Sequence, residues 1–321
     1  MGNKPLNPKL LSMFGMGGAA FGSYLPDMTE KTPGVLVLSA DMSTPAGLDK
    51  FKSKFPDRFI NVGIAEQNMI GVASGLADEG YKPICEAQSC FLSMRDYEQV
   101  RQFCGYMGVP LVLVGISGGL SLTFMGNTHY SLEDFALMRT VPGMSVIAPC
   151  DSLEAVKAID AALRLDTPVY IRLQGGAGWP AVHKSDIDFE IGKAIEMCKG
   201  SDAQIIATGS MVGQVMKAAE MLAADGISVT VTDMHTVKPL DNEAIDLDAN
   251  LIFTIEEHRP VGGLGDAVAT FLAEGKGSPR LIKISAPEGF PTVGDYEFLL
   301  KECGLTAQQI ADKIKTEINK L

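Results

Sequence analysis

Strand-like and helix-like segments alternate along the chain of 321 residues, and this alternation limits the fold more than any other feature. Short runs of Val, Ile and Leu are each followed by a longer segment with helical spacing of apolar residues. Such alternation predicts α/β layers, in which helices flank mostly parallel sheets. Strands are expected at 35–40, 59–62, 82–87, 111–116, 145–148, 169–173, 203 onward, 228–232, 251–255 and 280–284. Helices are expected at 67–79, 93–107, 132–140, 153–165, 212–224 and 264–273, with a last one running from the Thr306 and Gln309 capping box toward Leu321.

A Gly- and Pro-rich stretch, 174–180, interrupts the alternation and is followed by a polar run to Ser201. This composition is typical of a connection between domains. We therefore expect two domains, at 1–180 and 201–321, joined by a linker at 181–200. The chain is long enough for each domain to bury a core of its own.

The formal net charge of −12 disfavours nucleic acid and anionic membranes as partners, because like charges repel. No apolar run approaches the ~20 residues that a membrane-spanning helix needs. The first residues also lack the basic-then-apolar layout of a signal peptide. A cytoplasmic protein is the expectation.

The six cysteines and four histidines do not match the spacing of known metal sites. No Cys-x-x-Cys pair occurs, and no cysteine pairs with a histidine at zinc-site spacing. The cysteines are interpreted as thiols in a reducing cytosol. We expect no metal site built by this chain alone.

Glu66 is the first candidate functional residue. It lies where a β-branched strand gives way to a helix that is too apolar to face water, within residues 59–77. Open α/β sheets place their ligand sites at the carboxyl ends of strands, and a buried carboxylate without a partner is costly. Glu66 is therefore expected to be buried with a partner, although an acid favoured by the positive end of a helix would also fit this position.

Further candidates lie in three segments. Phe91, Met94 and Tyr97 are spaced three apart after a buried strand and would share one face of a helix, as would an ordinary amphipathic core segment. A long Gly-rich loop that follows another strand contains His129, and such loops often carry binding residues. Asp41 follows the first strand, where it could equally form a turn.

Taken together, these segments resemble transketolases over nearly the whole chain from Ser39. The matching blocks are the one around Glu66, Ser39-Ala-Asp-Met42, Gly126-Asn-Thr-His129 and a late block at 253–266. The resemblance implies a pyrimidine-type thiamine-diphosphate-binding domain followed by a transketolase C-terminal domain. It also implies that the late block is architectural, so Glu256, Glu257 and His258 are expected to be structural.

The resemblance implies a role for each candidate. Glu66 would pair with N1′ of the aminopyrimidine ring of thiamine diphosphate. Phe91 and Tyr97 stand at positions that enclose this ring, and Met94 replaces an aromatic residue of the family. Asp41 would lie near the thiazolium side. His129 would contact substrate hydroxyls near the reacting carbons.

One family motif is missing. In transketolases a Gly-Asp-Gly and a later Asn hold the metal ion and the diphosphate, and this chain has no Gly-Asp-Gly. The resemblance therefore implies one subunit of a split enzyme. An N-terminal transketolase subunit would supply the diphosphate-binding domain with Mg²⁺ or Ca²⁺, in an α2β2 assembly with the cofactor at the interface. The implied reaction transfers a two-carbon ketol unit from a ketose to an aldose.

The substrate clamp of the family is also altered. No Arg lies upstream of the first strand, Ser117 stands in place of a family His, and Met125 in place of a family Asp. Arg172 lies close to a family Arg but out of register. Because guanidinium groups recognise phosphate through paired hydrogen bonds, their loss favours another distal group on the sugar. A sulfonate, a branched sugar phosphate or an uncharged sugar is expected, in a pocket lined by His129, Ser117, Ser43 and Arg172.

Other functions remain open at this point. The β subunit of a 2-oxoacid dehydrogenase (E1-type) shares the domain pair and the Glu, but the His129 loop and the Asp41 strand end favour a transketolase. A 1-deoxyxylulose-phosphate synthase keeps the missing domain in one chain. A non-catalytic transketolase-like scaffold is the non-enzyme alternative, which Met94 and Met125 leave open.

Overall fold

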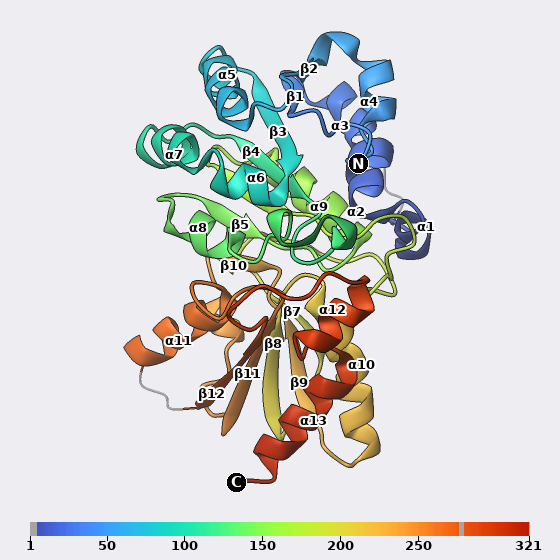
Figure 1. Cartoon of the computed structure of the whole chain (residues 1–321), viewed down its shortest axis with the longest axis vertical. Helices are drawn as coiled ribbons and strands as arrows, with labels where there is room; N and C mark the ends of the chain where they lie inside the picture. The colour runs from blue at the N-terminus through green and yellow to red at the C-terminus, as the bar shows by residue number, and fades with distance from the viewer. Residues whose placement is uncertain (1–4, 276–278, 321) are drawn as a thin grey trace.

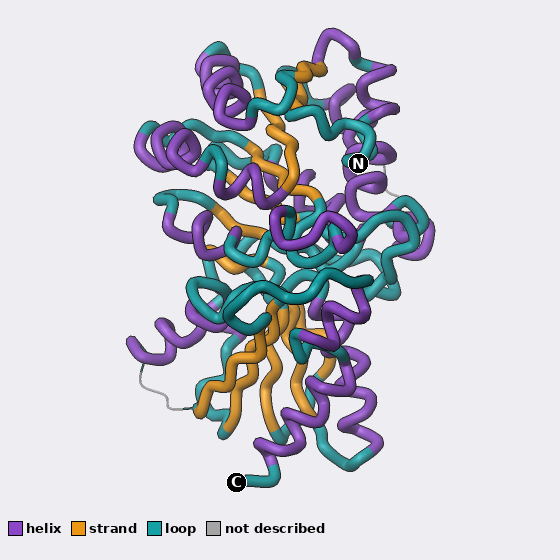
Figure 2. Tube along the Cα trace, in the orientation of Figure 1, coloured by secondary structure: helices purple, strands orange, loops and turns teal. Residues whose placement is uncertain are grey.

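The computed structural model describes residues 5–275 and 279–320, and it consists of two sheets arranged end to end along the long axis (Figures 1 and 2). Helices flank both sheets, and most neighbouring strands are parallel. The expected α/β architecture is therefore confirmed. The expected outer limits of the two domains, residues 1 and 321, lie outside the described residues.

The first sheet has seven strands in the order β10-β5-β6-β4-β3-β1-β2. All pairs are parallel except β10 with β5. Its central strands are continuous apolar runs that are buried along their length, as expected for parallel strands covered on both faces. The bounds are β1 (Val35–Ser39), β2 (Phe59–Asn61), β3 (Lys82–Gln88), β4 (Val112–Ile116), β5 (Ser145–Ile147), β6 (Val169–Arg172) and β10 (Thr236–Lys238).

Helices cover the two faces of this sheet with two separate cores (Figure 1). One core contains residues of α5, the π-helix η3 and α8, and the other contains residues of the N-terminal helices and α9. The bounds are α1 (Pro8–Ser12), α2 (Gly15–Gly17), η1 (Gly18–Tyr24), α3 (Leu25–Lys31), α4 (Asp49–Lys54), η2 (Pro56–Arg58), α5 (Glu66–Asp78), α6 (Ser89–Met94), α7 (Tyr97–Val100), η3 (Arg101–Tyr106), η4 (Thr123–Thr128), α8 (Asp134–Thr140) and α9 (Ser152–Ala162).

The second sheet has five strands in the order β12-β11-β8-β9-β7, with only β7 antiparallel. Helices α10, α12 and α13 cover one face, and α11 packs on the other. The Thr306 and Gln309 capping box is present at the start of α13. The bounds are β7 (Ile195–Cys198), β8 (Ala203–Ala207), β9 (Val229–Asp233), β11 (Leu251–Glu256), β12 (Arg280–Ser285), α10 (Met211–Ala224), η5 (Asn242–Ala244), α11 (Leu264–Glu274), α12 (Tyr296–Glu302) and α13 (Ala307–Ile318).

Two short strands join regions that the sequence separates. Strand β7 lies inside the range expected to be a linker, 181–200, and pairs with β9. Strand β10 comes from the second half of the chain but completes the edge of the first sheet against β5. The second half of the chain therefore contributes a hydrogen-bonded strand, β10, to the sheet of the first domain. Within the described residues, no helix combines the length and the apolar character needed to cross a bilayer.

Candidate active site

The candidate residues gather where the strand order of the first sheet reverses. Strand β2 lies on one side of β1 and β3 lies on the other, so the chain crosses over β1 between them. Ligands of open α/β sheets bind outside the carboxyl ends of the strands at such a point. Asp41 follows β1, Glu66 follows β2 and α6 follows β3, so these segments lie at the same edge.

Two candidates carry unusual backbone geometry at this edge. Asp41 and Ser117 are the non-glycine residues with positive φ in the described ranges, at 60° and 54°. Non-glycine residues in this region are strained, and such strain concentrates at functional sites. Asp41 is held by Asn61, whose amide donates to Asp41 Oδ1 at 3.0 Å and whose Oδ1 accepts from Asp41 N at 3.2 Å.

Glu66 is the first residue of α5 and is only 3% exposed. Its two carboxylate oxygens accept from Nη1 of Arg95 at 3.0 and 3.1 Å. The expected burial and the expected partner are therefore both present, and the partner within this chain is Arg95. Because Arg95 itself is 43% exposed, this cation can be displaced from Glu66 at little cost in desolvation.

Phe91 connects Glu66 to the Gly-rich loop. The guanidinium of Arg95 lies over the Phe91 ring, 3.8 Å from its centroid. The Phe91 ring also packs edge to face against the His129 ring, with the two centroids 5.1 Å apart. His129 Nδ1 lies 2.9 Å from Thr128 Oγ1. Glu66, Arg95, Phe91 and His129 thus form one continuous set of contacts.

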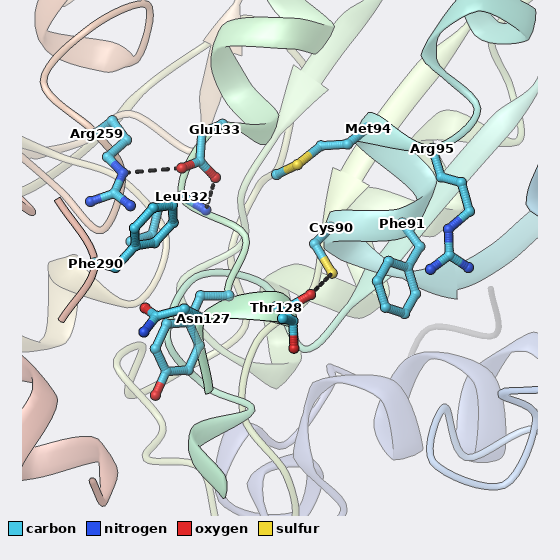
Figure 3. Close-up of a pocket in the computed structure, with 11 residues that line it drawn as sticks. Cys90, Phe91, Met94, Arg95, Asn127, Thr128, Leu132, Glu133, Arg259 and Phe290 are labelled. Atoms are coloured by element: carbon cyan, nitrogen blue, oxygen red, sulfur yellow. Dashed lines mark hydrogen bonds and ion pairs between the residues drawn. The ribbon is translucent and has the colours of Figure 1, made fainter. Parts of the chain in front are cut away.

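Phe91 and Arg95 of this set line a cavity of about 570 Å³ between the two domains (Figure 3). Phe91, Met94 and Arg95 enter it from α6 and its end, whereas Arg259 and Phe290 enter from the second domain. Arg259 is fixed across the domain boundary by Glu133, with Nε to Oε1 at 3.0 Å. The cavity therefore offers an aromatic and thioether wall, and the buried Glu66 lies behind the lining residue Arg95.

Sequence reasoning missed three polar residues in or next to α6, the helix that carries Phe91 and Met94. Arg95 was not assigned a role, although a charge in an apolar helix next to an expected buried carboxylate was a usable signal. Gln88 points its amide at the backbone oxygens of Ser117 and His129, each at 3.5 Å. Both carboxylate oxygens of Asp96 are buried without a hydrogen-bond partner in the described structure. Burial, followed by the nearby Glu66 charge, raises the pKa of Asp96 well above its usual range.

Tyr97 does not share a face with Phe91 and Met94, so that expectation is wrong. The helix expected at 93–107 is interrupted, because α6 ends at Met94 and α7 begins at Tyr97. The Tyr97 hydroxyl instead pairs with Thr140 Oγ1. Phe91 and Met94 line the cavity, whereas Tyr97 packs against the core on the α5 side of the sheet.

Arg172 is also placed differently from the expectation of a pocket-lining residue. It is 1% exposed, its Nη1 lies 3.5 Å from Asp134 Oδ1, and its Nη2 donates to the Glu257 carbonyl at 2.7 Å. Its guanidinium stacks over the Phe135 ring at 4.5 Å. Arg172 therefore stabilises the domain boundary, since its position at the end of a buried strand directs it inward.

Ser117 and the Ser43 loop lie at a smaller depression nearby. Ser117 and Pro45 both line a cavity of about 100 Å³, and Ser43 is 9% exposed in the loop before Pro45. The cavity bordered by Phe91 is a separate one. The structure thus brings Glu66, Phe91, Met94 and His129 together, whereas Ser117 lines the smaller cavity and Ser43 lies in the loop next to it.

The late acidic block has structural contacts throughout. Glu256 caps α11 by accepting from Leu264 N at 2.7 Å and Gly265 N at 2.8 Å. His258 stacks on Phe135, with ring centroids 5.1 Å apart. Its Nδ1 lies 2.8 Å from the Arg259 carbonyl, so this nitrogen carries the proton.

Comparisons with known proteins agree with this geometry. Residues 17–177 match the family model of the transketolase pyrimidine binding domain, and residues 192–310 match that of the transketolase C-terminal domain. A putative transketolase C-terminal section from Methanocaldococcus jannaschii is 35% identical, covering 94% of this chain and 95% of the relative. A 6-deoxy-6-sulfo-D-fructose transketolase subunit from Clostridium sp. is 38% identical over 89% of both chains.

A solved structure shows the same likeness. It is described as a split-gene transketolase in an inactive β4 tetramer, and it is 34% identical with a TM-score of 0.83 over 95% of this chain and 99% of its own. Sequence, domain order and structure agree over nearly the whole length. The chain therefore belongs to the transketolase family, with a pyrimidine-binding domain followed by a transketolase C-terminal domain.

Proposed function

We propose that this protein is the pyrimidine-domain subunit of a split, thiamine-diphosphate-dependent transketolase. It would act with a second chain that carries the diphosphate-binding domain. The observation that carries the proposal is the buried Glu66 at the strand-order reversal, next to the Phe91 wall of an open cavity. The relatives named as a transketolase C-terminal section and as a transketolase subunit support the division into two chains.

The residues present fit an aminopyrimidine ring. Such a ring has apolar faces and a polar edge, and the site offers Phe91 and Met94 beside a carboxylate. A buried carboxylate favours a partner that supplies a proton or a positive charge. Arg95 fills this role in the free chain, and its exposed side chain can give way to a ring nitrogen. No Gly-Asp-Gly occurs in this chain, so the metal and diphosphate would be held by the partner.

Each residue then has a defined task. When bound, thiamine diphosphate supplies the carbanion chemistry that breaks and forms the carbon–carbon bond. Glu66 holds a proton at the ring nitrogen and thereby sets the tautomer of the ring. Phe91 and Met94 hold the ring in place and exclude water from the carboxylate. His129, which packs on Phe91, donates to or accepts from substrate hydroxyls. Asp41 faces the same edge from β1.

The partner would cover the apolar surface beside this site. Ile64, just before Glu66, is 75% exposed, Phe124 in the Gly-rich loop is 77% exposed, and Phe290 at the cavity is 76% exposed. Large exposed apolar side chains on segments that flank a site mark an interaction surface. We infer an α2β2 assembly in which the diphosphate-binding domain covers these residues.

The substrate would be a sugar whose distal group is not the usual phosphate of transketolase substrates. Arg172, the residue that lies close in sequence to the phosphate-binding Arg of the family, is buried in contacts with Asp134 and Glu257. The Clostridium relative is named for a sulfo sugar, which agrees with a sulfonate at this end. A branched sugar phosphate and an uncharged sugar remain to be compared with it. Ser117 and Ser43, at the smaller cavity, are the candidate polar groups for the distal end.

The test is reconstitution with the candidate diphosphate-domain subunit, thiamine diphosphate and Mg²⁺. We expect calorimetric cofactor binding and ketol transfer only in the mixture, and the loss of most activity in Glu66→Gln because the proton at the ring nitrogen is no longer controlled. Glu79→Gln, at the exposed end of α5, is the matched control and should stay active. Retained turnover in Glu66→Gln would contradict the assignment of Glu66.

The alternatives give different outcomes in the same experiment. Pyruvate-dependent decarboxylation without ketol transfer would identify a 2-oxoacid dehydrogenase subunit. A stable complex that binds no cofactor would identify a scaffold. Good turnover of xylulose 5-phosphate would refute the proposal of an unusual distal group while leaving the transketolase assignment intact.

A further inference from the structure

A second cluster of reactive side chains lies outside the cavity lining, inside the junction of the two domains. Cys150, Glu154, His183 and Asp233 each present one atom able to bind a metal, and these four atoms lie within 4.8 Å of one another. The side chains are 1%, 0%, 6% and 0% exposed. None of these residues belongs to the candidate active site.

The four residues come from three separate parts of the chain. Cys150 follows β5, and Glu154 lies in the first turn of α9, so both belong to the first domain. His183 lies in the segment between the domains, and Asp233 is the last residue of β9 in the second sheet. A group that bound all four would therefore join both domains and the connection between them.

The cluster is held in place by backbone contacts around it. Asp151 caps α9, and its Oδ2 also accepts from Val182 N and His183 N at 2.9 and 3.0 Å. The Cys150 amide donates to Glu154 Oε2 at 2.8 Å, which leaves Glu154 Oε1 facing His183 Nε2 at 3.0 Å. The side chains are thus directed inward before any ligand arrives.

An unpartnered group points to a missing cation. Both oxygens of Asp233 are fully buried and have no hydrogen-bond partner in the described structure, although Oδ2 lies 3.8 Å from His183 Nε2. Buried polar groups without partners are rare and costly. The groups that face Asp233 in the cluster include the Glu154 carboxylate and the Cys150 thiol. His183 and His235 are the basic side chains beside the two carboxylates in the described part.

We propose that Cys150, Glu154, His183 and Asp233 bind one Zn²⁺ ion, or a similar divalent transition metal, as a structural cross-link between the two domains. One thiolate, one imidazole and two carboxylates match the ligand types of zinc, and four protein ligands with no open position are typical of structural sites. The edges of a zinc tetrahedron measure about 3.3–3.8 Å, so the ligand atoms need to close in by about 1.5 Å at most.

The proposal does not depend on the transketolase function, because it concerns ion binding by this chain. The full chain is stripped with a chelator, reconstituted with Zn²⁺, desalted and analysed for metal content. We expect close to one ion per chain. Co²⁺ in place of Zn²⁺ should give the intense visible bands of a tetrahedral site together with a thiolate-to-cobalt charge-transfer band.

Variants separate this site from adventitious binding. Cys150→Ser and His183→Gln should each lose the stoichiometric ion and the tetrahedral cobalt bands, and Cys150→Ser should lose the charge-transfer band. Cys104→Ser is the matched control, because Cys104 is equally buried but lies outside the cluster. Circular dichroism verifies that each variant is folded. Zn²⁺ at about 100-fold above its dissociation constant should raise the Tm of the parent protein by about 5 °C or more, but not that of Cys150→Ser.

Two results would overturn the proposal. The first is a reconstituted parent protein with no bound ion, which would leave Glu154 and Asp233 as a buried carboxyl pair that shares a proton. The second is an equal metal content in the parent protein, Cys150→Ser and His183→Gln, which would place the ion elsewhere on the chain.

Discussion

Glu257 offers a stringent test of how the two domains are held together. It is 2% exposed and accepts three hydrogen bonds, from Leu120 N of the first domain and from Ser210 Oγ and Tyr296 OH of the second, each at 2.5 Å. A hydrogen bond to a charged acceptor contributes about 1.5–3 kcal/mol and one to a neutral acceptor about 0.5–1.5 kcal/mol. Glu257→Gln keeps the shape but removes the charge and one acceptor oxygen.

The expected loss is therefore about 1 kcal/mol for each of the three bonds, or about 3 kcal/mol in all. With an m-value of about 3 kcal/mol/M, the midpoint of urea unfolding should fall by about 1 M. The single tryptophan, Trp179, is a suitable probe because its ring lies 5.5 Å from that of Tyr296, at this junction. Its fluorescence reports the unfolding of the region that Glu257 stabilises.

Two further variants make the measurement decisive. Glu288→Gln changes an exposed carboxylate and should move the midpoint by no more than about 0.2 M. Tyr296→Phe removes one of the three bonds, and in combination with Glu257→Gln it should cost less than the sum of the two single changes. A decrease below about 0.3 M for Glu257→Gln, or strict additivity of the pair, would refute the reasoning that this carboxylate joins the domains.

Three other predictions concern the site and its supports. Phe91→Ala should weaken thiamine diphosphate binding in the reconstituted complex by about 10–100-fold, because it removes the ring contact, and calorimetry checks this. His129→Ala should lower kcat/KM by a similar factor of about 10–100 with little change in cofactor affinity, and equal kinetics would remove His129 from the substrate site. Burial raises the pKa of Glu86 to about 8, so this carboxyl is protonated in the native state at neutral pH. Its contribution to stability is complete below about pH 4.3 and is lost as the pH rises to about 8, and Glu86→Gln should remove this part of the pH dependence in urea unfolding measured between pH 5 and pH 8.

Local sequence patterns were sufficient to predict most strands, because a parallel strand buried on both faces must be a continuous apolar run. Strands β1, β4 and β6 are such runs, and their positions agree with the expectation to within one or two residues. Strand β10 was not predicted, since its Thr-Val-Lys sequence is not an apolar run and its pairing with β5 depends on tertiary contacts. The same reason accounts for β7 within the expected linker.

The site was predictable where a motif fixed both the residue and its neighbourhood. Glu66 and Phe91 each lie on the helix that comes after a strand, in α5 after β2 and in α6 after β3. Their positions at the carboxyl edge of the sheet could therefore be inferred from the sequence. Tyr97 could not, because the interruption of the helix between Met94 and Tyr97 turns the side chain toward Thr140. The direction of the Arg172 side chain could not be predicted either. It is set by the contact with the Glu257 carbonyl of the second domain.

The zinc ligands illustrate a different limit of sequence reasoning. Spacing rules detect ligands that are close together in the chain, as in Cys-x-x-Cys, but Cys150, His183 and Asp233 come together only when two sheets and their connection are assembled. The sequence therefore contains little indication of this cluster. In the structure, the Asp233 carboxylate without a hydrogen-bond partner in the described residues indicates it.

Arg95 links the free and the cofactor-bound forms of the proposed enzyme. A buried Glu66 without a cation would carry the full cost of desolvation. In the proposed split enzyme, this charge would therefore need another cation until the cofactor binds. Arg95 provides it from an exposed position, with its guanidinium over the Phe91 ring. A ring that stacked on Phe91 and paired with Glu66 would compete for both contacts of Arg95 at once. Cofactor binding would then release the Arg95 guanidinium from Glu66. The diphosphate of the cofactor, held by the proposed partner subunit, is an anion with which this guanidinium could form an ion pair.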